Sequence, residues 1–160
     1  REALGRSGVK LILEPGRMIV GNAGILVARV IYMKETAHKT FVITDAGMND
    51  LIRPTLYDAW HDILPVRESH DRPRVRADVV GPVCESGDYI ARNRQMPKLE
   101  QGELVAIMTA GAYGAVQSGT YNTRALAPEV LVKGGRVAVV RPRQPLEQLV
   151  GLDRLAAWQT

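Results

Sequence analysis

Two short stretches place charged or reactive side chains directly after apolar runs. Residues 14–17 read EPGR and follow the aliphatic run VKLIL (9–13), so a carboxylate and a guanidinium stand at the end of an expected buried strand. That is where α/β barrels and sheets build their sites. In GPVCESGD (81–88), Cys84 and Glu85 share one loop, which makes the thiol a candidate for catalysis. The alternatives are an ordinary turn with exposed charges for EPGR and a small buried hydrophobe for Cys84.

Two further stretches have side chains suited to a planar or anionic ligand. On a helix over NDLIRPTLY (49–57), Arg53 and Tyr57 are four residues apart, so both project from one face and together can grip a carboxylate. In GAYG (111–114), the glycines leave little from their own segment to pack around Tyr113, so its ring is free to lie against a planar group or to donate its hydroxyl. The alternatives are an exposed arginine and a tyrosine of the core.

Metal and nucleotide chemistry have no support in the sequence. His38, His61 and His70 lie near turns without a metal-ligand spacing, and neither a Walker pattern nor G-x-G-x-x-G occurs. The single cysteine excludes an intramolecular disulfide and a multi-cysteine metal site. We therefore expect no bound metal.

Composition indicates one globular domain with a short extension. Of the 160 residues, 46% are hydrophobic and 24% charged, and the net charge of +4 comes mostly from dispersed arginines. The one basic cluster, VRESHDRPRVR (66–76), is interrupted by acidic residues, and aromatic residues make up only 5%, which argues against nucleic-acid binding. No apolar run reaches the ~18 residues that cross a bilayer, and REALGRSG has no signal-peptide apolar region. We expect a cytoplasmic protein with no membrane partner.

Most elements expected after residue 24 are short strands separated by turns. The clearest is a hairpin over 128–143, where Gly134 and Gly135 supply the positive φ of a tight turn. Pro54 predicts a short helix that starts close to it. Strands are also predicted at 9–13, 25–36, 41–47, 62–66, 77–83 and within 99–109, helices at 18–24 and 145–153, and mostly loop at 88–97 and 110–124. The pattern predicts a mainly β barrel or sandwich preceded by an α/β remnant.

Four stretches together resemble the C-terminal part of diaminopimelate decarboxylases. EPGR, DAGMNDLIRPTLY, GPVCESGD and GAYGAVQSGTYNTR occur in this order, and the resemblance covers about residues 9–150. That family consists of pyridoxal-phosphate enzymes with an alanine-racemase-like fold, in which a (β/α)₈ barrel with the cofactor lysine precedes a C-terminal β domain. The resemblance implies that residues 1–24 are the end of that barrel, with its last strand, and that residues 25–160 are the C-terminal β-barrel domain with short helices.

The resemblance also implies cofactor-binding roles. Glu14 would face the pyridine nitrogen and keep the ring protonated, and Gly16 would lie near the cofactor phosphate. Arg17 would meet the phosphate or a substrate carboxylate, and Tyr113 would lie next to cofactor and substrate.

The implied substrate is meso-diaminopimelate, which is decarboxylated to L-lysine in lysine biosynthesis. Arg53 and Tyr57 match positions that hold the substrate, and Glu85 would pair with its distal ammonium. Cys84 matches the residue that protonates the product carbon after CO₂ leaves, acting on the partner subunit's cofactor, so the resemblance implies a homodimer. A thiol suits this role because its unperturbed pKa of about 8.5 keeps it mostly protonated at neutral pH.

The departure from the family is the missing barrel. None of the lysines has the surroundings expected of the lysine that binds the cofactor: Lys10, Lys34, Lys39, Lys98 and Lys133. Since the chain also starts without Met in what looks like a helix end, we expect a fragment of a longer protein that alone neither binds cofactor covalently nor turns over.

Two rival interpretations remain open. An ornithine or arginine decarboxylase of the same fold also carries an EPGR-like motif, but in the ornithine enzymes the cysteine is usually followed by Asp-Gly, whereas here CESGD follows. The other rival is a non-catalytic β-barrel interaction module. An upstream coding region for a lysine-bearing barrel would favour the enzyme over the module.

Overall fold

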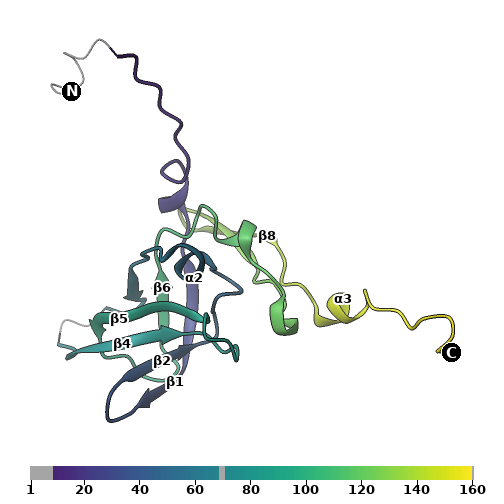
Figure 1. The fold of residues 1–160 in the computed structure, drawn as a ribbon. Helices are drawn as coiled ribbons and strands as arrows, with labels where there is room; N and C mark the ends of the chain where they lie inside the picture. Colours follow the sequence, from purple (N-terminus) through teal and green to yellow (C-terminus); the bar gives the residue numbers. More distant parts are fainter. Residues whose placement is uncertain (1–8, 69–70, 160) are drawn as a thin grey trace.

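The computed structural model describes residues 9–68 and 71–159, so the helix end expected in residues 1–8 and His70 lie outside it. Its body is a strongly curved six-stranded sheet (Figure 1). The strands are β1 (Leu26–Glu35), β2 (Thr40–Thr44), β3 (Ile63–Pro65), β4 (Arg74–Val80), β5 (Tyr89–Pro97) and β6 (Leu104–Ile107). The other elements are η1 (Gly21–Ala23), α2 (Arg53–Tyr57), η2 (Ala115–Gln117), η3 (Tyr121–Thr123), the hairpin β7 (Glu129–Lys133) and β8 (Arg136–Arg141), and α3 (Leu146–Val150).

The six strands follow the order β3-β6-β1-β2-β4-β5, and the two edge strands, β3 and β5, come into contact. Neighbours are antiparallel except β2 and β4, which run parallel and are connected through α2 and β3. The sheet is therefore a nearly closed barrel, as the sequence predicts. Because β2, β4 and β6 point in the same direction, the loops that follow them emerge at one end of the barrel.

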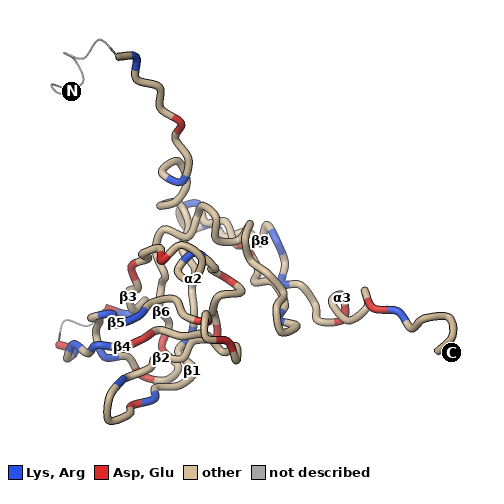
Figure 2. Tube along the Cα trace, viewed as in Figure 1, with Lys and Arg blue, Asp and Glu red and all other residues tan. Residues whose placement is uncertain are grey.

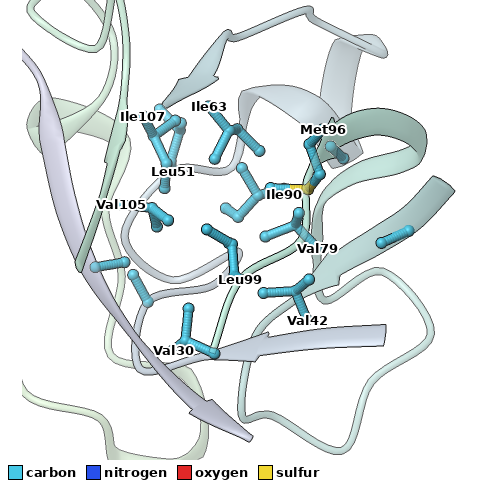
Figure 3. Packing of buried hydrophobic residues seen from close by; sticks show 14 residues of the cluster. Val30, Val42, Leu51, Ile63, Val79, Ile90, Met96, Leu99, Val105 and Ile107 are labelled. Carbon is cyan, nitrogen blue, oxygen red and sulfur yellow. The ribbon is translucent and has the colours of Figure 1, made fainter. Parts of the chain in front are cut away.

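The core forms because alternate residues of each strand face inward. In β1, Ala28 and Val30 are buried between exposed neighbours. Val30 meets Val42, Val79 and Leu99 inside the barrel (Figure 3). Leu51, from the loop after β2, closes the end of the core near Ile107.

Strand β5 corrects the prediction of mostly loop at 88–97. The strand has a bulge at Asn93, whose φ of 49° lies in the left-handed region that asparagine tolerates, and the burial alternation shifts there. The buried carboxylate of Asp78 accepts the Asn93 amide N–H at 2.7 Å. After the bulge Arg94 points inward, so the sequence YIARNRQMP lacks the simple alternation by which strands are recognised.

The run VKLIL (9–13) corrects the prediction of a strand there. It is extended but pairs with none of the described residues, and Leu11, Ile12 and Leu13 are 60–75% exposed. A strand needs a neighbour to satisfy its N–H and C=O groups, and no described segment supplies one. In Figure 1 this segment leads away from the barrel.

The predicted hairpin is confirmed, with Gly134 at φ 59° in its turn. It lies beside the barrel and carries exposed apolar residues on both strands (Figure 1). Figure 2 shows basic and acidic positions interspersed over barrel and hairpin, in keeping with the small net charge. Among the described residues, no helix is long and apolar enough to cross a membrane.

Candidate active site

Three loops from distant parts of the chain meet at the end of the barrel where β2, β4 and β6 finish. They are residues 45–52, 81–88 and 108–124, and together with residues 16–24 and helix α2 they carry all the predicted site residues except Glu14. The structure therefore brings together stretches up to about a hundred residues apart in sequence.

Asp88 ties the first two loops together. Its buried carboxylate accepts the amide N–H of Met48 at 2.7 Å and that of Val83 at 2.6 Å. A side chain on Gly47 or Gly81 would collide with this carboxylate. The glycines are thus required by the close approach, and the loop with Cys84 and Glu85 is held at a fixed distance from the loop after β2.

Asn49 ties the first loop to the third. Its buried side-chain amide donates to the carbonyls of Gly119 at 3.0 Å and Tyr121 at 2.8 Å. Arg124 donates to the Asp45 carbonyl at 2.6 Å and lies 3.7 Å from the Asp50 carboxylate. Burial raises the pKa of Asp50 above 3.8, against the opposing effects of the Gly47 N–H and Arg124.

Residues 108–114 pack backbone to backbone on residues 20–24. The amides of Ala110 and Gly111 donate to the carbonyls of Gly24 at 2.8 Å and Gly21 at 3.0 Å. A Cβ on Gly24 would lie 2.6 Å from the Gly111 Cα, so the approach requires glycine at both sites. This contact fixes EPGR relative to the GAYG stretch.

Arg17, Gly16 and Tyr113 meet at this contact. The half-buried Arg17 donates from Nη2 to the Thr109 carbonyl at 2.9 Å. A Cβ on Gly16 would lie 3.5 Å from the Tyr113 hydroxyl, so the phenol stands directly over the Pro-Gly turn. Tyr113 is 45% exposed, and the alternative of a core tyrosine is therefore wrong.

Arg53 lies between two phenol rings. Its guanidinium carbon is 5.7 Å from the centre of the Tyr57 ring and 5.8 Å from that of Tyr113. Its Nε is buried without a hydrogen-bond partner, and it makes no ion pair with any described acidic residue. An unpaired, half-buried guanidinium between aromatic rings suits a carboxylate or phosphate ligand.

Cys84 and Glu85 are exposed at the tip of the loop after β4. The Thr55 hydroxyl of α2 donates to the Gly87 carbonyl, which joins this loop to the helix that carries Arg53 and Tyr57. The alternative of a buried hydrophobic cysteine is therefore wrong. A groove beside Glu85 is lined by Lys39, Asp78 and Arg92 but not by Arg17, Arg53 or Tyr113.

Glu14 stands apart from the other predicted site residues. It is exposed on the extended segment before residue 16, and no hydrogen bond or ion pair joins it to a described residue. No group of three metal-ligating side chains occurs among residues 9–68 and 71–159.

Sequence reasoning missed several buried polar residues at this end of the barrel, among them Asn49, His61, Asp88 and Arg94. Burial lowers the pKa of His61 below 6.5, and the positive charges of Arg17, Arg53 and Arg94 lower it further. The hydrogen bond to the Met108 carbonyl opposes this by raising the pKa. The one available signal was a pair of glycines, Gly81 and Gly87, around Asp88; nothing marks His61 or Arg94.

A comparison with known protein families identifies the fold and covers part of the candidate site. Residues 18–111 match the family described as pyridoxal-dependent decarboxylase, C-terminal sheet domain. This range contains the six-stranded barrel and the first loops of the cluster. The chain belongs to this family of decarboxylases, whose cofactor is a pyridoxal group.

The more specific likeness is to diaminopimelate decarboxylases. The enzyme of that name from Pseudomonas aeruginosa is 52% identical over 155 residues, which are 97% of this chain and 37% of the relative. The one from Aquifex aeolicus is 50% identical over 141 residues, 88% of this chain and 33% of the relative. The chain thus spans about a third of the length of these relatives.

Among solved structures too, a diaminopimelate decarboxylase is more similar to this chain than a lysine/ornithine decarboxylase is. The diaminopimelate decarboxylase from Helicobacter pylori complexed with L-lysine has a TM-score of 0.80 and 42% identity, over 94% of this chain and 37% of that one. The lysine/ornithine decarboxylase from Vibrio vulnificus complexed with cadaverine has a TM-score of 0.60 and 30% identity, over 76% of this chain and 33% of that one.

Arg17, Arg53 and Tyr113 could form one wall of a site for pyridoxal phosphate. The Nε atoms of Arg17 and Arg53 are buried without partners among the described residues, which suits an anionic group, and the Tyr113 ring offers a planar surface. Two of the lysines are engaged in ion pairs, Lys39 with Asp78 and Lys98 with Glu35.

Proposed function

We propose that this chain is the C-terminal part of a pyridoxal-phosphate-dependent decarboxylase that converts meso-diaminopimelate to L-lysine. The observation that carries the proposal is the position of Arg53, unpaired between Tyr57 and Tyr113 on the helix joined to the Cys84 loop. The identity near 50% to diaminopimelate decarboxylases over most of the chain supports the choice of substrate.

Four residues have roles toward the cofactor, set by charge, size or ring structure. Pyridoxal phosphate, when bound, supplies the electron sink for the bond to the departing carboxylate. Glu14 would hold a proton on the ring nitrogen, Gly16 leaves space for the phosphate, and Arg17 binds an anionic group. Tyr113 stacks or donates from its hydroxyl.

Substrate binding falls to Arg53 and Tyr57 for the distal carboxylate and to Glu85 for the distal ammonium. Cys84 delivers the proton from its Sγ to the product carbon. Because Cys84 and Glu85 are exposed, and the groove that Glu85 lines does not include Arg17, the proposal includes a homodimer in which they serve the partner's site. The corresponding location is the cytoplasm.

The rival functions have less support. An ornithine- or arginine-type decarboxylase requires no partner for a distal carboxylate, and the lysine/ornithine enzyme is a more distant structural match. A non-catalytic module gives no reason for an unpaired Arg53 on a helix that is joined to the loop with the exposed Cys84. The 160-residue chain alone is expected to be inactive, because the cofactor lysine is not in it.

The test uses the full-length protein loaded with pyridoxal phosphate. CO₂ release is measured with meso-diaminopimelate, ornithine, arginine and lysine as substrates. We expect turnover with meso-diaminopimelate and values of kcat/KM at least about 100-fold lower with the others, since the distal ion pairs are lost. Faster decarboxylation of ornithine or arginine contradicts the proposal.

Variants of the same protein separate the roles. Arg53→Leu is expected to raise KM by roughly 10- to 150-fold, as for a lost hydrogen bond to a charged group. Cys84→Ala is expected to lower kcat by roughly 10²- to 10⁴-fold with little change in KM. Arg143→Leu, at an exposed position far along the chain, is the matched control and should change neither.

A further inference from the structure

The two edges of the barrel are joined by a side chain at the end that carries the site. Strands β3 and β5 have no backbone ladder between them. Instead, Arg94 of β5 donates from Nη1 to the carbonyl of His61, just before β3, at 2.8 Å. The Arg94 guanidinium carbon lies 3.3 Å from the centre of the Trp60 ring, which holds the charge in its buried position.

The His61 ring continues this connection into the loop after β6. Its side chain is only 1% exposed, and Nδ1 lies 2.8 Å from the Met108 carbonyl. Because a carbonyl only accepts, Nδ1 carries the hydrogen and donates. Nε2 is buried without a hydrogen-bond partner among the described residues, as fits the neutral ring.

The backbone after Met108 is strained where the site residues attach. Thr109 has φ 60° and Tyr113 φ 59°, both in the left-handed region that is costly for residues with a Cβ, above all for β-branched threonine. The carbonyl of Thr109 accepts from Arg17, and Tyr113 faces Gly16 and Arg53. Such a conformation persists only where the surroundings hold it.

We propose that Trp60, Arg94 and His61 form a closure cluster that couples closing of the barrel to the placement of Arg17 and Tyr113. His61 and Arg94 are positioning residues: they act through the Met108–Tyr113 backbone and touch neither cofactor nor substrate. An apolar side chain of similar size fills the same volume but gives the Met108 carbonyl no donor. The roles of Arg17 and Tyr113 rest on the proposed function, while the coupling does not.

The coupling is tested by hydrogen exchange in the full-length protein. His61→Leu removes the donor at similar volume, whereas the amide nitrogen of His61→Asn occupies nearly the place of Nδ1 and still donates. We expect amide exchange in segments 17–21 and 109–114 to rise about tenfold or more in His61→Leu and to return near the parent rate in His61→Asn. Exchange in β1 and β2 should change little in both.

Arg94→Lys is the second variant, because lysine keeps the charge but not the planar group that stacks on Trp60. It should raise exchange in the same two segments, which keeps the test decisive if His61→Leu does not fold. Equal effects of Leu and Asn, a rise spread evenly over the barrel, or no rise at 109–114 overturns the inference.

A binding measurement then links the cluster to the site. The dissociation constant for pyridoxal phosphate should rise in His61→Leu and recover in His61→Asn. If the protein decarboxylates none of the substrates tested, the proposed function fails while the exchange result still decides the coupling.

Discussion

The barrel and the segments on either side of it contain similar apolar residues but cover them differently. Val30, Val42 and Val79 of the barrel are almost completely buried against one another. Leu13 before the barrel is 75% exposed and Leu131 in the hairpin 62% exposed. The strands of the barrel supply their own core, whereas the extended segment before the barrel and the hairpin after it expose apolar surface of the kind found at interfaces. A sequence typical of a strand therefore does not show what covers its apolar side chains.

The largest expected difference is in the free energy of unfolding, when a leucine is replaced by alanine in the barrel and, separately, in the hairpin. Leu51→Ala removes a fully buried side chain from the barrel and should lower the free energy of unfolding by about 2–5 kcal/mol. Leu131→Ala, in the hairpin, should change it by less than about 0.5 kcal/mol in this chain. Urea unfolding followed by circular dichroism measures both. Equal losses would mean that the hairpin is as well packed as the barrel.

Asp88 stabilises the loops at the end of the barrel, and the segments before and after the barrel have no comparable buried carboxylate among the described residues. Asp88→Asn keeps the shape but sets an amide group against the N–H of Met48 or Val83, so we expect a loss of about 1.5–3 kcal/mol of unfolding free energy. Asp153→Asn, exposed near the end of the chain, is the control and should have no measurable effect. A loss of similar size in both variants would contradict the role assigned to Asp88.

The pH dependence of stability is the smallest of these effects. Because burial and the charges of Arg17, Arg53 and Arg94 lower the pKa of His61, the unfolded chain binds its proton first. The stabilisation is complete above pH 6.5 and is lost as pH falls below it, by at most about 1.4 kcal/mol per pH unit. Asp50, whose pKa is raised from 3.8, acts in the opposite sense at lower pH.

Unfolding free energies between pH 5.5 and 7 test this assignment. His61→Asn should flatten the slope in that range, and His38→Asn, at an exposed turn, should leave it unchanged. An unchanged slope in His61→Asn would show that another group is responsible.

Much of the fold could be predicted from sequence because its signals are local. The β-branched runs of β1 and β2, Pro54 at the start of α2 and the Gly134 turn each depend only on neighbouring residues. Strand β5 could not be predicted, because its bulge is stabilised by Asp78 from another strand. The run at 9–13 was wrongly predicted as a strand for the converse reason. Its apolar composition can be read from the sequence, but whether a neighbouring strand pairs with it cannot.

The site was predictable as a set of residues but not as an arrangement. The resemblance to decarboxylases indicates Arg17, Arg53 and Tyr113 together, and the structure brings them close through the contact of residues 20–24 with 108–114. Asp88 lies in the stretch GPVCESGD, but its role, like those of His61 and Arg94, comes from long-range contacts with backbone groups that no local pattern shows.

The pairing of β1 with β6 has a consequence for synthesis of the chain. Leu26 pairs with Ile107, so β1 is translated about eighty residues before its second partner exists. Until then it has β2 on one side and an unpaired edge on the other, and contacts so distant in sequence form slowly. On the ribosome the barrel closes only after β6 has emerged, and until then the unpaired edge of β1 is open to pairing with another chain.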